Sequence, residues 1–125
     1  MTENDISYKV IGTAIEIHKN IGPGLLASAY ENTLAYDLKE LGFVVKQQVP
    51  MPFIYKGVKQ DVGYCVDLLG NNKVILEIKA VEELAPVDSA QLLTYLKLSG
   101  LKLGLLINFN SKTLKNSIHR VDNNL

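Results

Sequence analysis

The sequence predicts an α/β fold in which helices pack on one mixed β-sheet, and three observations support this prediction. Apolar residues near the N-terminus recur at three- and four-residue steps, as on the buried face of a helix. Short runs rich in Val, Ile and Leu follow in the middle of the chain, as expected for strands. A helical segment then connects two such runs, and this strand–helix–strand spacing indicates a right-handed crossover between parallel strands.

Length and composition limit the class of protein. With 125 residues, 47 % apolar and 21 % charged, the chain is expected to form a single domain over residues 1–125. The 13 Lys and Arg residues balance 13 Asp and Glu residues, so any contact with nucleic acid must depend on local clusters of Lys. The single Cys65 excludes an intrachain disulfide and a Cys-based zinc site. No signal peptide or transmembrane stretch is recognisable, and we expect a cytoplasmic protein.

Two helices are predicted in the N-terminal third. The first covers about residues 5–20, after which Gly22 and Pro23 interrupt the helical pattern. The second covers about residues 25–41, and Gly42 ends it. Four residues form the apolar stripe that we expect to be buried on the second helix: Leu26, Tyr30, Leu34 and Leu38.

Strands are predicted next. Residues 43–45 and 49–55 are extended in pattern, and their two prolines favour an edge strand. Val66–Leu69 and Val74–Ala80 flank a Gly-Asn-Asn-Lys connection, which predicts a hairpin or a tight strand pair.

A third helix and a buried strand complete the predicted fold. The helix begins near Pro86 and ends at Ser99-Gly100, with Val87, Leu92, Leu93 and Leu96 on its expected apolar face. Residues 103–109 are continuously apolar, as in a strand that is buried on both faces. The tail from Asn110 either adds a short strand or stays loose.

Charged residues interrupt the two central strands. Glu77 and Lys79 are two residues apart and therefore share one face of their strand, and Asp67 can reach that face from the partner strand. Two carboxylates and an ammonium group on one sheet face are costly unless they bind something, and a divalent metal is the obvious candidate. The alternative is a solvated face on which Glu77 and Lys79 pair with each other.

The third helix carries a second group of polar residues. Gln91 and Tyr95 are one helical turn apart and share a face, which can point back over Glu77. The alternative is a polar pair that faces solvent.

Several blocks of the chain, in their order and spacing, resemble a known family. The blocks are Ile21-Gly22-Pro23-Gly24, Tyr30-Glu31, Val66-Asp67-Leu68-Leu69, Glu77-Ile78-Lys79-Ala80-Val81-Glu82, Ala90-Gln91-Leu92-Leu93-Thr94-Tyr95-Leu96 and Gly104-Leu105-Leu106-Ile107-Asn108-Phe109. They resemble the GxxExxY family, which is placed in the PD-(D/E)XK nuclease-like superfamily. The resemblance covers nearly the whole chain and implies an α-β-β-β-α-β core.

The resemblance also implies a site and an activity. Asp67 and Glu77 match the carboxylates that hold Mg²⁺ or Mn²⁺, Lys79 matches the catalytic lysine, and Glu31 matches a helical acidic residue aimed at the metal. Glu31 is alternatively a solvated surface residue. Three further residues are expected to support the site or contact the substrate: Gln91, Tyr95 and Tyr30.

Two positions depart from the family pattern. Gly24 and Tyr30 are in place, but Ala27 stands where the family has Glu, so the chain has lost either a metal ligand or a structural hydrogen bond. Cys65 stands where a basic residue is more usual.

The function expected from the resemblance is metal-dependent hydrolysis of phosphodiester bonds in nucleic acid, with DNA favoured over RNA, and analogy suggests a homodimer. The alternative is a catalytically weak or inactive nuclease-fold module that binds nucleic acid or a protein partner. Ala27 and the zero net charge favour the alternative, and the intact Asp67, Glu77 and Lys79 favour the enzyme.

Overall fold

A computed structural model describes all residues from 1 to 125 and contains three α-helices, one short 3₁₀ helix and seven strands. In chain order these are α1 (Glu3–Ile21), α2 (Ala27–Glu40), β1 (Val45–Met51), β2 (Ile54–Tyr55), β3 (Val58–Lys59), β4 (Tyr64–Gly70), β5 (Val74–Lys79), α3 (Pro86–Ser99), β6 (Leu103–Asn108), η1 (Leu114–Ser117) and β7 (Ile118–Asp122).

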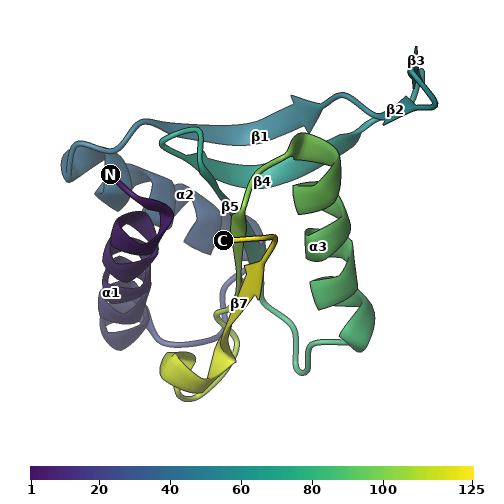
Figure 1. Cartoon of the computed structure of the whole chain (residues 1–125). Coiled ribbons are helices and arrows are strands. Elements are labelled where there is room, and N and C mark those ends of the chain that lie inside the picture. The colour runs from purple at the N-terminus through teal and green to yellow at the C-terminus, as the bar shows by residue number, and fades with distance from the viewer.

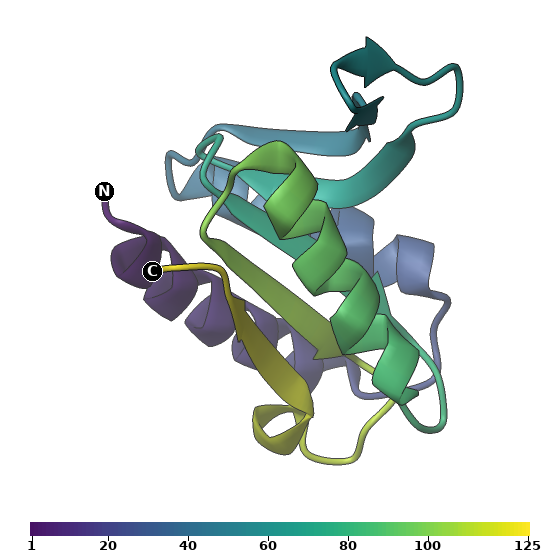
Figure 2. The ribbon, with the colours of Figure 1, turned by 45° about the vertical axis from the view of Figure 1, so that its right-hand side comes forward.

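Five strands form one mixed sheet in the order β1-β4-β5-β6-β7. The β5–β6 pair is parallel and the other neighbouring pairs are antiparallel, as a crossover through α3 requires. Helices α1 and α2 lie on one side of the sheet and α3 on the other (Figure 1, Figure 2). The α/β prediction is therefore confirmed, and α2, β1, β4, β5, α3 and β6 supply the expected α-β-β-β-α-β core.

The sheet separates two apolar cores. The first core joins α1 and α2 to one face of the sheet, with Ile6, Val10, Leu34 and Leu76 among its fully buried residues. The second core joins α3 to the opposite face, where Leu92 and Leu96 are also fully buried. Every residue of β6 is buried, in agreement with its continuous apolar sequence.

Local sequence explains where several elements begin and end. Thr2 and Asp5 exchange hydrogen bonds in a capping box at the start of α1. Gly100, in the left-handed conformation, ends α3. The Lys56-Gly57 turn, at φ values of 51° and 77°, closes the separate β2–β3 hairpin, which projects away from the rest of the molecule (Figure 1, Figure 2).

Two details of the predicted helix faces are wrong. Leu26 precedes α2 and is 77 % exposed, and Val87 in the first turn of α3 is 66 % exposed. Both lie at helix ends, where the neighbouring chain does not cover every apolar position.

The tail from Asn110 forms the short strand that was one of its two predicted forms, since β7 pairs with β6 at the edge of the sheet. No helix of the structure combines the length and the hydropathy that a membrane span requires.

Candidate active site

The pairing of β4 with β5 places Asp67 opposite Glu77. Leu69 pairs with Ile75 and Leu68 with Leu76, so the next step of the same register brings Asp67 and Glu77 together. The backbone pairing ends at this point, and the Asp67 carboxylate takes part in its place. Asp67 Oδ2 accepts a hydrogen bond of 2.8 Å from the Ile78 N–H. The two strands therefore separate where the two carboxylates meet.

Glu77 is the most unusual group of this site. The residue is 7 % exposed, and its Oε1 atom is buried without a hydrogen-bond partner. Burial and the nearby negative charge of Asp67 raise the pKa of Glu77 to about 8. A buried oxygen atom without a donor is expensive for a fold, and a bound cation would remove this cost.

Lys79 is the last residue of β5 and lies on the same face as Glu77, as the alternation of side chains along a strand predicted. The residue is half-buried, and it forms no salt bridge, because the one salt bridge of the structure joins Arg120 to Asp122. The alternative in which Lys79 is neutralised by pairing with Glu77 is therefore not observed. Its ammonium group remains available for an anionic ligand.

Glu31 comes to the site from α2, which lies on the face of the sheet opposite to α3. It is 8 % exposed, and its oxygen atoms accept hydrogen bonds from Gln47 Nε2 at 3.2 Å and Gln48 Nε2 at 2.9 Å. The alternative of a solvated Glu31 is therefore wrong. Gln48 Nε2 also lies 3.3 Å from Asp67 Oδ1, so one amide group connects Glu31 to Asp67.

The two glutamines were missed by sequence reasoning. Their only signal is that they are adjacent polar residues in the predicted edge strand, and solvent exposure explains that pattern equally well. Their role depends on the pairing of β1 with β4, which brings Gln47 opposite Leu68 and thus near Asp67.

Tyr95 of α3 lies beside the carboxylates. Burial, followed by the charges of Glu77 and Asp67, raises the pKa of Tyr95. Its ring stacks on Tyr64 with 4.4 Å between centroids, and the Tyr64 hydroxyl donates a 3.1 Å hydrogen bond to the Tyr95 carbonyl oxygen. Gln91, one turn earlier on α3, is exposed, and its side chain forms no hydrogen bond within the chain. Helix α3 therefore borders the site, with Tyr95 fixed and Gln91 accessible.

Tyr30 has a different position from its neighbour Glu31. The residue is fully buried, and its ring stacks on Phe109 with 4.5 Å between centroids. Its hydroxyl donates to the Gly22 carbonyl oxygen at 2.6 Å and accepts from the Leu25 N–H at 3.2 Å. These contacts hold the α1–α2 loop, and none of them is to Asp67, Glu77 or Lys79.

The carboxylates of the site meet the needs of a divalent metal ion in part. No group of three or more His, Cys, Asp or Glu side chains lies close enough together to hold an ion. The adjacent Asp67 and Glu77 offer oxygen ligands of the kind that Mg²⁺ and Mn²⁺ prefer, and Mg²⁺ is commonly bound by one or two carboxylates plus water and substrate phosphates. The unpartnered Glu77 Oε1 fits this arrangement. Glu31 is linked to the pair through Gln48.

Comparison with known proteins supports the same interpretation. The family model described as the PD-(D/E)XK nuclease superfamily matches residues 4–121. No curated protein and no solved structure matches the chain. The matched region includes β1 to β6, all of β7 except Asp122, and every residue of the candidate site, and its order of helices and strands is that of the expected core. The chain therefore belongs to the PD-(D/E)XK nuclease superfamily.

Proposed function

We propose that this protein is a divalent-metal-dependent nuclease that hydrolyses phosphodiester bonds, with DNA as the favoured substrate. The observation that carries the proposal is the buried, unpartnered Glu77 Oε1 beside Asp67, with Lys79 unpaired on the same strand face. A pair of carboxylates and a lysine that only maintained the fold would be expected to neutralise each other. Here no salt bridge joins them, and these groups are left for a ligand.

Each residue has a role that follows from its chemistry. Asp67 and Glu77 would hold Mg²⁺ or Mn²⁺, which supplies an activated water molecule and neutralises charge on the phosphoryl group. Lys79 donates hydrogen bonds to a phosphoryl oxygen on which negative charge accumulates in the transition state. Tyr95 and Gln91 border the space above the carboxylates and contact the phosphate backbone. Glu31 acts on Asp67 through Gln48.

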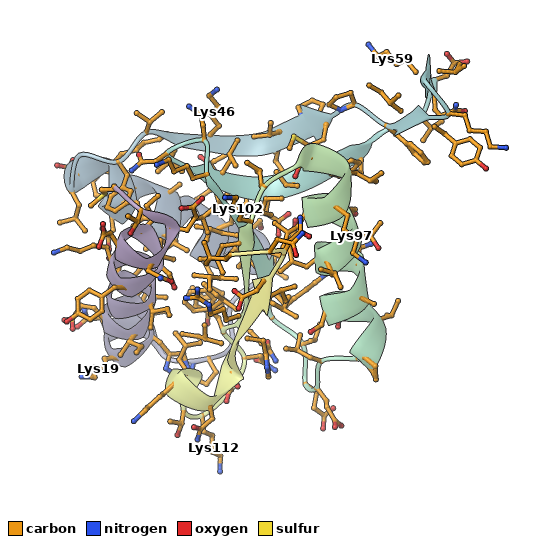
Figure 3. All side chains as sticks on the ribbon, in the orientation of Figure 1. Lys19, Lys46, Lys59, Lys97, Lys102 and Lys112 are labelled. Carbon is orange, nitrogen blue, oxygen red and sulfur yellow. The ribbon has the colours of Figure 1, made fainter.

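Further aspects of the proposal rest on the resemblance and, for the cytoplasm, on the single Cys65. We infer that the chain is a member of the GxxExxY family, that it acts in the reducing cytoplasm, and that it forms a homodimer to cut both strands of a duplex. The lysines labelled in Figure 3 lie on different parts of the fold rather than on one face. Affinity for nucleic acid therefore depends on contacts near the site more than on a large basic surface.

The first experiment measures cleavage of labelled single- and double-stranded DNA and RNA with Mg²⁺ or Mn²⁺. Lys79→Ala is expected to lower kcat about 100-fold or more, because a donor to the developing charge is lost. Lys102→Ala is the matched control, since this exposed lysine precedes β6, at the opposite end from Lys79, and it should cleave like the wild type. Equal activity of Lys79→Ala and wild type would contradict the proposal.

The second candidate function is a nuclease-fold module that binds without cleaving, and Ala27 is the observation that favours it. Ala27 is the first residue of α2, at the position where the family pattern has Glu. Binding of DNA by a wild type that does not cleave it, together with cleavage by Ala27→Glu, would support this second function. Cleavage by the wild type would exclude it.

A further inference from the structure

Gln48 has a backbone conformation that is unusual for its position. Its φ angle is 49°, in the left-handed region, where residues other than glycine are uncommon. The other residues with this property, apart from glycines, are Lys56, Asn71, Asn72 and Asn124, which lie in turns or in the C-terminal tail. Gln48 alone lies inside a strand of the main sheet. Strain of this kind is kept only where surrounding contacts enforce it, and it often occurs at functional sites.

The strand pairing is interrupted at the same place. Gln47 pairs with Leu68 and Val49 pairs with Val66, whereas Gln48 and Asp67 face each other without pairing. The register is the same before and after the interruption. Both strands therefore depart from regular pleating at one shared point.

This interruption reverses which face of the sheet each strand presents. In β1, Val45 belongs to the first core, but Val49 packs against the second core. In β4, Leu68 belongs to the first core and Val66 to the second. Residues an even number of positions apart would share a face in a regular strand, so the pleat reverses at Gln48 and at Asp67.

The reversal directs the Gln48 side chain between two carboxylates from different elements. Its Nε2 atom is 2.9 Å from Glu31 Oε1 of α2 and 3.3 Å from Asp67 Oδ1 of β4. Its Oε1 atom accepts from Cys65 Sγ at 3.6 Å. The amide orientation follows from these neighbours, since ionised carboxylates accept hydrogen bonds and the NH₂ group must face them. An amide also connects the two carboxylates without adding a positive charge that would repel a cation.

From these contacts we infer that Gln48 is a positioning residue that fixes Asp67 relative to Glu31, and that the strained backbone at Gln48 is what allows it to do so. One consequence of this inference rests on the proposed function: the positioned Asp67 binds a divalent cation more tightly. Ligands held by hydrogen bonds from neighbouring residues bind metal better, and loss of such a neighbour commonly costs about 10- to 100-fold in affinity.

The test separates the side chain from the backbone strain. Gln48→Gly removes the amide but accepts a positive φ without strain, so the relieved strain offsets part of the cost of losing the two hydrogen bonds, and thermal unfolding should show that the metal-free variant remains folded. Its affinity for Mn²⁺, measured calorimetrically, should fall about 10- to 100-fold. Unchanged affinity of this variant would overturn the inference.

Two matched variants control for other causes. Gln60→Ala removes a half-buried glutamine of the hairpin region, whose side chain donates only to the Val58 carbonyl oxygen, and it should leave Mn²⁺ binding unchanged. Gln47→Ala removes a donor to Glu31 but none to Asp67, so it should weaken Mn²⁺ binding less than Gln48→Gly. An equal loss in Gln47→Ala and Gln48→Gly would overturn the inference, because contact with Glu31 alone would then explain both.

A measurement without metal keeps the inference distinct from the proposed function. The side-chain NH₂ signal of Gln48, assigned by its absence in Gln48→Ala, should shift in both Glu31→Gln and Asp67→Asn when followed by NMR of the metal-free protein. A signal that responds to neither substitution would overturn the inference. If the signal responds to both but the wild type binds no Mn²⁺ and cleaves nothing, then the proposed function fails and the positioning role of Gln48 stands.

Discussion

The carboxyl group of Glu77 lies inside the sheet, where burial and the charge of Asp67 raise its pKa from 4.5 to about 8. Between these two values the folded chain binds a proton that the unfolded chain has released. Raising the pH through this range therefore lowers the free energy of unfolding, by up to about 1.4 kcal/mol per pH unit. Below the lower value both states are protonated, and Glu77 no longer contributes to the pH dependence.

Glu77→Gln should remove this pH dependence, because a glutamine of nearly the same shape has no proton to release. Urea unfolding of the metal-free protein, followed between about pH 5 and pH 8, should show the wild type losing stability with pH and the variant changing much less. Glu83→Gln, at an exposed position, is the control and should behave like the wild type. A wild type whose stability rises steadily over this range would contradict the assignment of a raised pKa to Glu77.

At the residue scale, the sequence predicts what depends on local periodicity. Glu77 and Lys79 share a face because side chains alternate in any strand, and Asp67 reaches that face because a short connection joins the two strands. The positive φ of Gln48 and the burial of Glu31 could not be predicted in the same way. Both depend on which strand pairs with β1 and on how α2 crosses the sheet, and neither leaves a local pattern in the sequence.

At the scale of elements, the approach of α3 to β6 depends on a glycine. A Cβ atom added to Gly104 would lie 2.7 Å, 2.9 Å and 3.0 Å from three side-chain atoms of Leu92, which is fully buried in the second core. Because the whole Leu92 side chain would have to move within a packed core, Gly104→Ala should cost about 1–3 kcal/mol of stability. Chemical denaturation measures this loss.

A glycine in α1 offers the matched control. Gly12 lies within the helix, and an added Cβ atom would have no neighbour within 4 Å. Gly12→Ala should therefore keep or raise stability, by up to about 1 kcal/mol, because alanine favours the helical conformation. A loss of stability in Gly12→Ala equal to that in Gly104→Ala would show that the contact with Leu92 is not the cause.

The elements themselves were largely predictable, since each depends on signals within a few residues. Gly100 after α3 and the apolar sequence of β6 both mark positions where the structure has the expected feature. The errors at Leu26 and Val87 have one physical cause. Periodicity identifies the apolar face of a helix, but it cannot tell how far along that face the rest of the protein extends.

At the scale of the whole molecule, the single sheet lies between two cores that contact different helices. Tyr30 stacks on Phe109 in the first core, and Tyr64 stacks on Tyr95 beside the second. Because both cores are built on the same strands, loss of either would expose one face of β4, β5 and β6. We therefore expect residues 1–125 to unfold as one cooperative unit.

Two substitutions on opposite faces of the sheet test this expectation. Leu34→Ala removes fully buried atoms from the first core, and Leu92→Ala removes them from the second. Each should lower stability by about 2–5 kcal/mol. In one cooperative unit, each substitution shifts the entire transition, and the far-UV circular dichroism of the backbone changes together with the near-UV signal of the tyrosines. Were the α3 side an independent unit, Leu92→Ala would instead separate an early transition from a later one at the position of the wild type.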